Sequence, residues 1–100
     1  MSSGTIPRPS VFSIDIIEAG GAGSIPDLLP YIQGLPDGIT IIKNSNKPAN
    51  RPTGGDWGGY FIFKLWGSGR AIYFNTNLIA VSDAISSSTT SITWGLFHNS

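Results

Sequence analysis

Apolar and polar residues alternate over Gly58–Thr76, and this alternation predicts a β-hairpin. In the first arm, Tyr60–Trp66, successive side chains fall on opposite faces because side chains alternate across a strand with a period of two. One face carries Phe61, Phe63 and Leu65, and the other carries Tyr60, Ile62, Lys64 and Trp66. The face of Phe61, Phe63 and Leu65 is predicted to be the core.

The hairpin returns through Gly67-Ser68-Gly69 into a second arm, Arg70–Thr76. A three-residue loop would place Trp66 opposite Arg70, where the indole could stack on the guanidinium. A two-residue turn would shift every pairing, and the sequence leaves both registers open. The face opposite the predicted core would also be strongly apolar if exposed, with Ile62, Trp66, Ile72 and Phe74 in a row. We therefore expect the N-terminal strand, a short helix or a neighbouring subunit to cover it.

Further β-branched and apolar segments predict strands over Val11–Glu18, Ile39–Lys43, Leu78–Val81 and Ile92–Phe97. Asn44–Asp56, which is rich in Asn, Pro and Gly, is predicted to be a long functional or mobile loop. Neighbouring strands can pair locally, so we expect an antiparallel arrangement.

One short helix is predicted after the glycine-rich segment that ends at Gly23. Ser24 is expected to be its N-cap, with Asp27 completing a capping box. Leu28, Leu29 and Ile32 are expected to pack inward, and Gly34 can end the helix.

The predicted fold class is therefore mainly β (α+β): a small antiparallel β-sheet or sandwich of about five to six strands with one short helix. Residues 1–10 are interpreted as a linker or junction, and residues 11–100 as a single β-rich, knob-like domain. A domain of 100 residues buries only a modest core. It has no cysteine, so disulfides are excluded and oligomerisation is the simplest further source of stability.

Charge narrows the range of partners. Only 12% of the residues are charged, the net charge is zero and no basic cluster exists. Long-range attraction to nucleic acid or to an anionic membrane is therefore not expected. No apolar run is long enough to span a bilayer, so membrane insertion is not expected either.

The residue types that catalysis requires are sparse. The single histidine is His98, no GxSxG setting surrounds a serine, and the glycine-rich residues 54–59 lack the lysine of a phosphate-binding loop. The acidic residues fit caps, turns and loops, and their spacing indicates no carboxylate pair of the kind that a glycosidase needs. We expect no enzyme activity, no cofactor and no metal.

Binding chemistry is better represented. Trp57 stands beside Asp56 between two glycine pairs, so a ligand or another backbone could approach it closely, although simple loop packing would also explain it. Trp and Tyr rings suit both sugar rings and protein interfaces. Trp94, inside an apolar strand, is expected to belong to the core. The candidate ligand-binding residues are Trp57, Asp56, Tyr60, Asn50, Trp66 and Arg70.

The order of motifs resembles the pyocin knob domains of phage tail fibres and R-type pyocin fibres. The resemblance covers residues 24–97 and rests on Pro-Asp-Gly38 before GITIIKN, Asn-Lys-Pro-Ala-Asn-Arg-Pro at 46–52, GGYFIFKL, RAIYFNTN and the late Thr93-Trp94. The chain departs from the family pattern at residues 78–86, which contain neither Tyr nor Arg, and in its Trp94-Gly95-Leu96-Phe97 ending.

The resemblance implies a non-catalytic, homotrimeric domain of a phage tail fibre or tailspike. It would be extracellular on the virion and would bind a bacterial surface polysaccharide. Three alternatives remain: a purely structural trimerisation cap, a standalone carbohydrate-binding module, and a glycan hydrolase.

Overall fold

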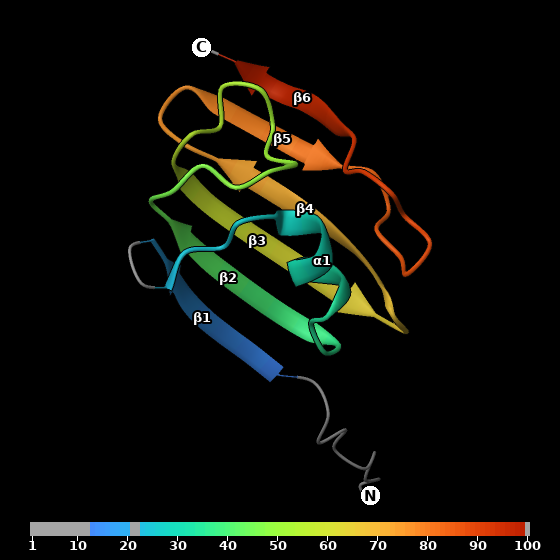
Figure 1. The fold of residues 1–100 in the computed structure, drawn as a ribbon. Coiled ribbons are helices and arrows are strands. Elements are labelled where there is room, and N and C mark those ends of the chain that lie inside the picture. Colours follow the sequence, from blue (N-terminus) through green and yellow to red (C-terminus); the bar gives the residue numbers. More distant parts are fainter. Residues whose placement is uncertain (1–12, 21–22, 100) are drawn as a thin grey trace, which may run out of the picture.

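The computed structural model describes residues 13–20 and 23–99, which form one six-stranded sheet and one helix (Figure 1). The interpreted linker, Met1–Ser10, lies outside these residues. The strands are β1 (Ser13–Ala19), β2 (Gly38–Asn44), β3 (Gly58–Leu65), β4 (Ser68–Phe74), β5 (Leu78–Ser82) and β6 (Trp94–Asn99). The mainly β fold class and the strand number are confirmed.

The sheet has the strand order β1-β2-β3-β4-β5-β6, and it is mixed. Strands β2 to β6 pair antiparallel in sequence order, whereas β1 pairs parallel with β2. The expectation of a wholly antiparallel sheet was wrong at this edge. The chain between β1 and β2 contains the helix α1 (Leu28–Gln33), and a parallel pair requires such a crossover connection.

Helix α1 begins one turn later than expected. Its N-cap is Asp27, which has extended backbone angles and whose carboxylate accepts a hydrogen bond from Leu29 N at 3.1 Å. Ser24 therefore does not cap the helix. Pro30 falls in the first turn, where its missing N–H removes no helical hydrogen bond. Gly34 ends the helix, and Leu28, Leu29 and Ile32 are buried, as predicted.

The hairpin presents the opposite face to the core from the one predicted. Tyr60, Ile62 and Lys64 are at most 4% exposed, whereas Phe61, Phe63 and Leu65 are 37–43% exposed. Helix α1 and the connection between β2 and β3 lie on the same side of the sheet, and they cover the Tyr60 face (Figure 1). Both faces of this strand are apolar, so alternation alone could not decide which face is covered.

The hairpin turn has two residues, Trp66 and Gly67, both with positive φ. Leu65 consequently faces Ser68, and Phe63 faces Arg70. The three-residue alternative, with Trp66 opposite Arg70, was wrong. Among the described residues, no cation–π contact joins these two side chains.

The long connection between β2 and β3 packs on the core. Pro48 and Pro52 are fully buried, and Ala49 forms a parallel bridge with Asp27 through two backbone hydrogen bonds. Asn46 Nδ2 donates to Ile25 O at 2.8 Å. This segment is thus a cover for the core, and it fixes the position of the residues that follow it.

One buried cation ties the helix to the sheet. Lys64 Nζ donates to the carbonyl oxygens of Ile32, Gln33 and Leu35 at 3.0, 2.8 and 2.6 Å. These carbonyls belong to the end of α1 and the turn after it, where helical carbonyls lack intrahelical partners. These three hydrogen bonds offset the cost of burying the ammonium, which explains why a lysine can lie among the core residues of β3.

The other side of the sheet is apolar, and no helix or loop within residues 13–20 and 23–99 lies over it (Figure 1). We call it the open face. Register partners form a continuous row across five strands: Ile16, Ile41, Phe61, Ile72 and Val81. Seven large side chains of this face are 37–68% exposed: Ile14, Ile16, Phe61, Phe63, Leu65, Ile72 and Phe74.

Candidate functional site

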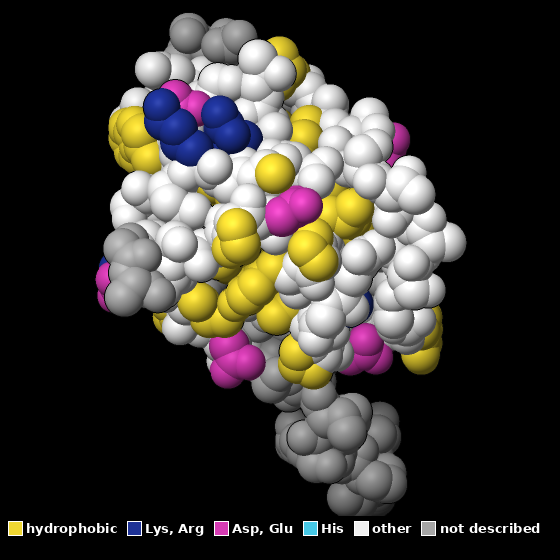
Figure 2. Space-filling model, in the orientation of Figure 1, with side chains coloured by type: hydrophobic (Ala, Val, Ile, Leu, Met, Phe, Trp, Pro, Cys, Tyr) yellow, Lys and Arg dark blue, Asp and Glu magenta, His cyan; other side chains and the backbone are white. Residues whose placement is uncertain are grey.

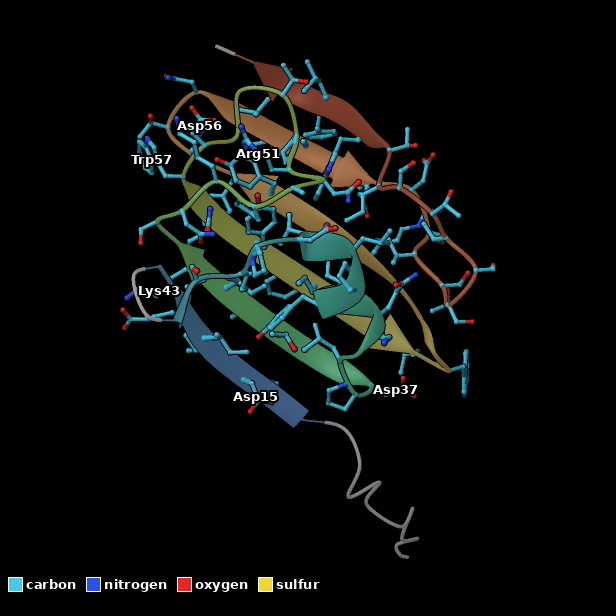
Figure 3. The ribbon with its side chains drawn as sticks, viewed as in Figure 1. Asp15, Asp37, Lys43, Arg51, Asp56 and Trp57 are labelled. Atoms are coloured by element: carbon cyan, nitrogen blue, oxygen red, sulfur yellow. The ribbon has the colours of Figure 1, made fainter. Side chains whose placement is uncertain are left out.

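Trp57 lies at the corner of the sheet where β3 begins, close to Asp56 and Arg51 (Figure 3). Its side chain is 57% exposed. Its backbone carbonyl accepts a hydrogen bond from the hydroxyl of the buried Tyr73, and Asn75 Nδ2 lies 3.5 Å from the same oxygen. The indole is therefore displayed on the surface while its backbone is fixed to the core.

The two glycines after Trp57 are required by close packing. A Cβ atom at Gly58 would lie 2.4 Å from Phe74 O, and one at Gly59 would lie 2.8 Å from the Phe74 ring. Gly59 and Phe74 are register partners in the β3–β4 pair. A larger residue at Gly58 would push the β4 backbone away, and one at Gly59 would displace the Phe74 ring, so the glycines let this ring lie against the backbone of β3.

Trp57, Phe74 and this glycine backbone line a cleft of about 580 Å³. Two half-exposed aromatic rings thus meet at one site, since Phe74 is 53% exposed. Polar groups stand around them: Asn75, Thr76 and the ion pair of Lys43 with Glu18, whose charged atoms are 3.5 Å apart. Aromatic faces surrounded by hydrogen-bonding groups suit a ligand with apolar ring faces and hydroxyl edges, as a sugar has.

Asp56 is engaged with cations beside this cleft. Its carboxylate oxygens lie 3.2 Å from Arg51 Nε and 3.7 Å from Lys47 Nζ. Figure 2 shows these basic side chains gathered beside an acidic group at one corner of the helix-bearing face. The pairs are solvent-exposed, so water and salt screen them, and their contribution to stability is small.

Tyr60, a predicted ligand residue, lies in the core and has no exposed surface. Its ring contacts Tyr73 at a centroid distance of 4.8 Å and Trp94 at 6.1 Å. Burial raises the pKa of the Tyr60 phenol, and the neighbouring Tyr73 raises it further. Tyr60 can affect the cleft only by packing against Tyr73, whose hydroxyl donates to the backbone carbonyl of Trp57.

Asn50 is a structural residue. Its side-chain Nδ2 donates to Asp27 Oδ1 at 2.8 Å, and its side-chain Oδ1 accepts from Ile92 N at 3.0 Å. Its backbone carbonyl accepts from Trp94 Nε1 at 2.7 Å. Both ends of the side-chain amide are thereby used, which explains why the residue is held at a φ of +67°. The structure places Trp94 against the core, as predicted.

Trp66 and Arg70 belong to the other end of the hairpin. The turn that contains Trp66 is held by Asp37, which Figure 3 places at the far end of the sheet from Trp57. Of the six predicted ligand residues, the structure therefore brings Trp57 and Asp56 together and separates Trp66 and Arg70 from them. Phe74, Lys43 and Glu18 also line the cleft. The strand register brings them there, so no local sequence pattern indicated them.

Four of the acidic residues have structural partners: Asp27 caps α1, Asp37 holds the hairpin turn, and Glu18 and Asp56 form ion pairs. The side chain of His98 lies outside the described part of the structure. Within residues 13–20 and 23–99, no group of three or more His, Cys, Asp or Glu residues is placed to hold a metal ion. Across the same part of the chain, no helix has the length and apolarity needed to cross a membrane.

No protein family, curated protein or solved structure matches this chain.

Proposed function

We propose that this chain is a non-catalytic assembly and receptor-binding domain of a phage tail fibre or tailspike, acting as a homotrimer that binds a bacterial surface glycan. The open face is the main support for this proposal, because a monomer in solution would leave its apolar side chains in contact with water. The fibre context rests on the order of motifs in residues 24–97, which resembles the pyocin knob domains.

The size of the open face favours burial. Phe61, Phe63 and Phe74 together expose about 1.3 whole rings, or roughly 200–330 Å². Four aliphatic side chains of the same face add to this area. The largest apolar patch on a typical monomer is about 300–600 Å² and is often functional. The open face is at least comparable with such functional patches.

A second copy of the chain is the occupant that the charges favour. The chain has no net charge, so copies do not repel one another at long range. Among the paired strand residues, Arg70 is the one charged residue in the middle of the open face. Lys43 and Glu18 also lie on this face, but they form an ion pair at the end of their strands. An apolar surface with so little charge is complementary to itself.

Burial of the open face favours association. The exposed fractions of its seven large side chains amount to about 3.5 whole side chains, and each whole side chain contributes about 1.5–3 kcal/mol when buried. The quality of the contacts between copies, rather than the buried area alone, then sets the affinity.

The mass in solution tests this assembly. Light scattering coupled to size-exclusion chromatography should give three times the chain mass at micromolar concentrations. Ile72→Lys puts a charge in the middle of the open face at a half-exposed position, so it should yield a folded monomer. Ser87→Lys, on an exposed loop, is the matched control and should keep the assembly. A wild-type chain that stays monomeric at millimolar concentration would refute the proposal.

Glycan binding is proposed for the cleft beside Trp57. Three weak sites on one trimer would raise the effective affinity by avidity without further contacts. On an array of bacterial surface glycans, Trp57→Ala should abolish binding, and the exposed control Thr53→Ala should leave it unchanged. Unchanged binding in Trp57→Ala would refute this site. A trimer that binds nothing would favour a structural cap, and full binding by the Ile72→Lys monomer would favour a standalone carbohydrate-binding module.

A further inference from the structure

The β3–β4 turn displays Trp66 in an unfavourable backbone conformation. Trp66 is 91% exposed, and its φ is +54°. Together with Gly67, at φ +77°, it forms the left-handed pair of a two-residue hairpin turn, where Asn, Asp and Gly are strongly preferred. A bulky residue is an outlier there, and such outliers concentrate at functional sites.

A carboxylate from another part of the chain holds this turn. Asp37 accepts hydrogen bonds from Trp66 N at 2.8 Å and from Gly67 N at 3.2 Å. Asp37 directly precedes β2, so the contact fixes the tip of the hairpin to the body of the domain. The fixed turn keeps the indole in solvent, although nothing in the fold requires a tryptophan there.

A groove of about 420 Å³ lies beside the turn on the open face. Phe63, Leu65 and Ala84 supply apolar walls, and Arg70 supplies a cation. Among the described residues, Arg70 has neither an ion-pair partner nor a side-chain hydrogen bond. An apolar groove with an unpaired guanidinium suits an aromatic ring, because a cation is attracted to the face of an indole.

We propose that Trp66 of one copy occupies the Phe63–Leu65–Arg70 groove of a second copy. This inference rests on the proposed self-assembly and names its interlocking contact. Turn and groove lie side by side on one chain, so in a closed ring each copy would insert its indole into one neighbour and receive an indole from the other. The indole would pack on Phe63 and Leu65 and stack on the Arg70 guanidinium. Trp and Arg are the residue types that most often dominate interface energies.

Trp66→Asn is the sharpest test, because it should preserve or increase the stability of the fold while it weakens the contact between copies. Asn suits the left-handed turn position, so the urea midpoint of the variant should equal or exceed that of the wild type. The dissociation constant of the full chain, measured by sedimentation velocity, should rise at least about 30-fold, the effect expected of an interface hot spot. Thr53→Ala, at an exposed position in the connection between β2 and β3, is the control and should leave association unchanged.

A double-mutant cycle identifies the partner of the indole. Arg70→Gln should weaken association, and it should add little to Trp66→Asn because the cation would already have lost its ring. If the wild type associates and both variants associate equally well, this contact is wrong while the proposed assembly stands. If the wild type remains monomeric at millimolar concentration, the proposed assembly fails as well. Selective loss of glycan binding in Trp66→Asn, with association intact, would also overturn the contact and assign the indole to a ligand.

Discussion

Replacing Lys64 with Met should loosen α1 from the sheet without leaving a large cavity. Lys64 is 4% exposed, and its ammonium donates to three carbonyls at the end of α1 and in the turn after it. Met keeps most of the apolar stem, so the substitution removes the charge and the hydrogen bonds while preserving most of the packing.

The magnitude follows from two opposing terms. Each hydrogen bond to a charged group contributes about 1.5–3 kcal/mol net, and an unsatisfied buried carbonyl costs about 1–3 kcal/mol. Removing the ammonium also removes the several kcal/mol that its own desolvation costs in the folded state. We therefore expect Lys64→Met to lower the free energy of unfolding by about 2–4 kcal/mol, out of the roughly 5–15 kcal/mol typical of a domain. The urea midpoint should fall by roughly 1–3 M.

Urea unfolding followed by circular dichroism measures this loss at one fixed protomer concentration. Lys43→Met on the adjacent strand is the control, because its ion pair with Glu18 is exposed and should contribute less than about 0.5 kcal/mol. Hydrogen exchange should localise the effect: the amides of Gly34 and Leu35, which close the end of α1, should exchange faster while those of β3 and β4 keep their protection. Equal stability of the Lys64→Met variant and the wild type would refute the reasoning.

Three further predictions concern the sheet. Gly58→Ala should lower the free energy of unfolding by more than about 2 kcal/mol, because its Cβ would lie 2.4 Å from Phe74 O. Gly67→Ala has open space around its Cβ and should lower it by only about 1 kcal/mol. Equal shifts of the melting temperature in the two variants would contradict this. Tyr60→Phe should raise the free energy of unfolding by about 1 kcal/mol, since the buried hydroxyl has no hydrogen-bond partner among the described residues. A urea midpoint below that of the wild type would count against this prediction. Burial raises the pKa of Tyr60 above the unfolded value of about 10, so stability should be full below pH 10 and fall above it by about 1.4 kcal/mol per pH unit. A pH series should show a shallower alkaline fall in Tyr60→Phe, and an unchanged slope would refute that assignment.

Local patterns predicted the elements well. Period-two alternation and turn residues located the strands, because these signals act within a few residues of one another. The end of the helix at Gly34 and its buried residues also followed from local chemistry. The cap was misplaced at Ser24 because Ser24 and Asp27 both fit the preference for an N-cap, and only the bridge between Asp27 and Ala49 settles where α1 begins.

The failures arose where distant segments decide the outcome. The parallel pairing of β1 with β2 depends on how the crossover connection packs. The local pattern of apolar residues does not specify whether a strand runs parallel or antiparallel to its neighbour. Likewise, Trp57 stood out from the sequence because glycines flank it, whereas Phe74 did not. The position of Phe74 in the cleft depends on its register opposite Gly59, and a one-residue slip of the hairpin would have turned it to the other face.

The two cations of the hairpin connect these points to the proposed assembly. Lys64 and Arg70 lie on neighbouring strands of one sheet, on opposite faces. On the covered face, the chain itself supplies three carbonyls to the ammonium of Lys64. On the open face, the described residues supply no acceptor for the guanidinium of Arg70, although apolar side chains surround it. A covered open face requires a partner for Arg70 beyond the described residues, because an unpaired buried charge costs several kcal/mol. A second copy that brings only apolar surface would not meet this requirement, whereas one that brings the Trp66 indole would.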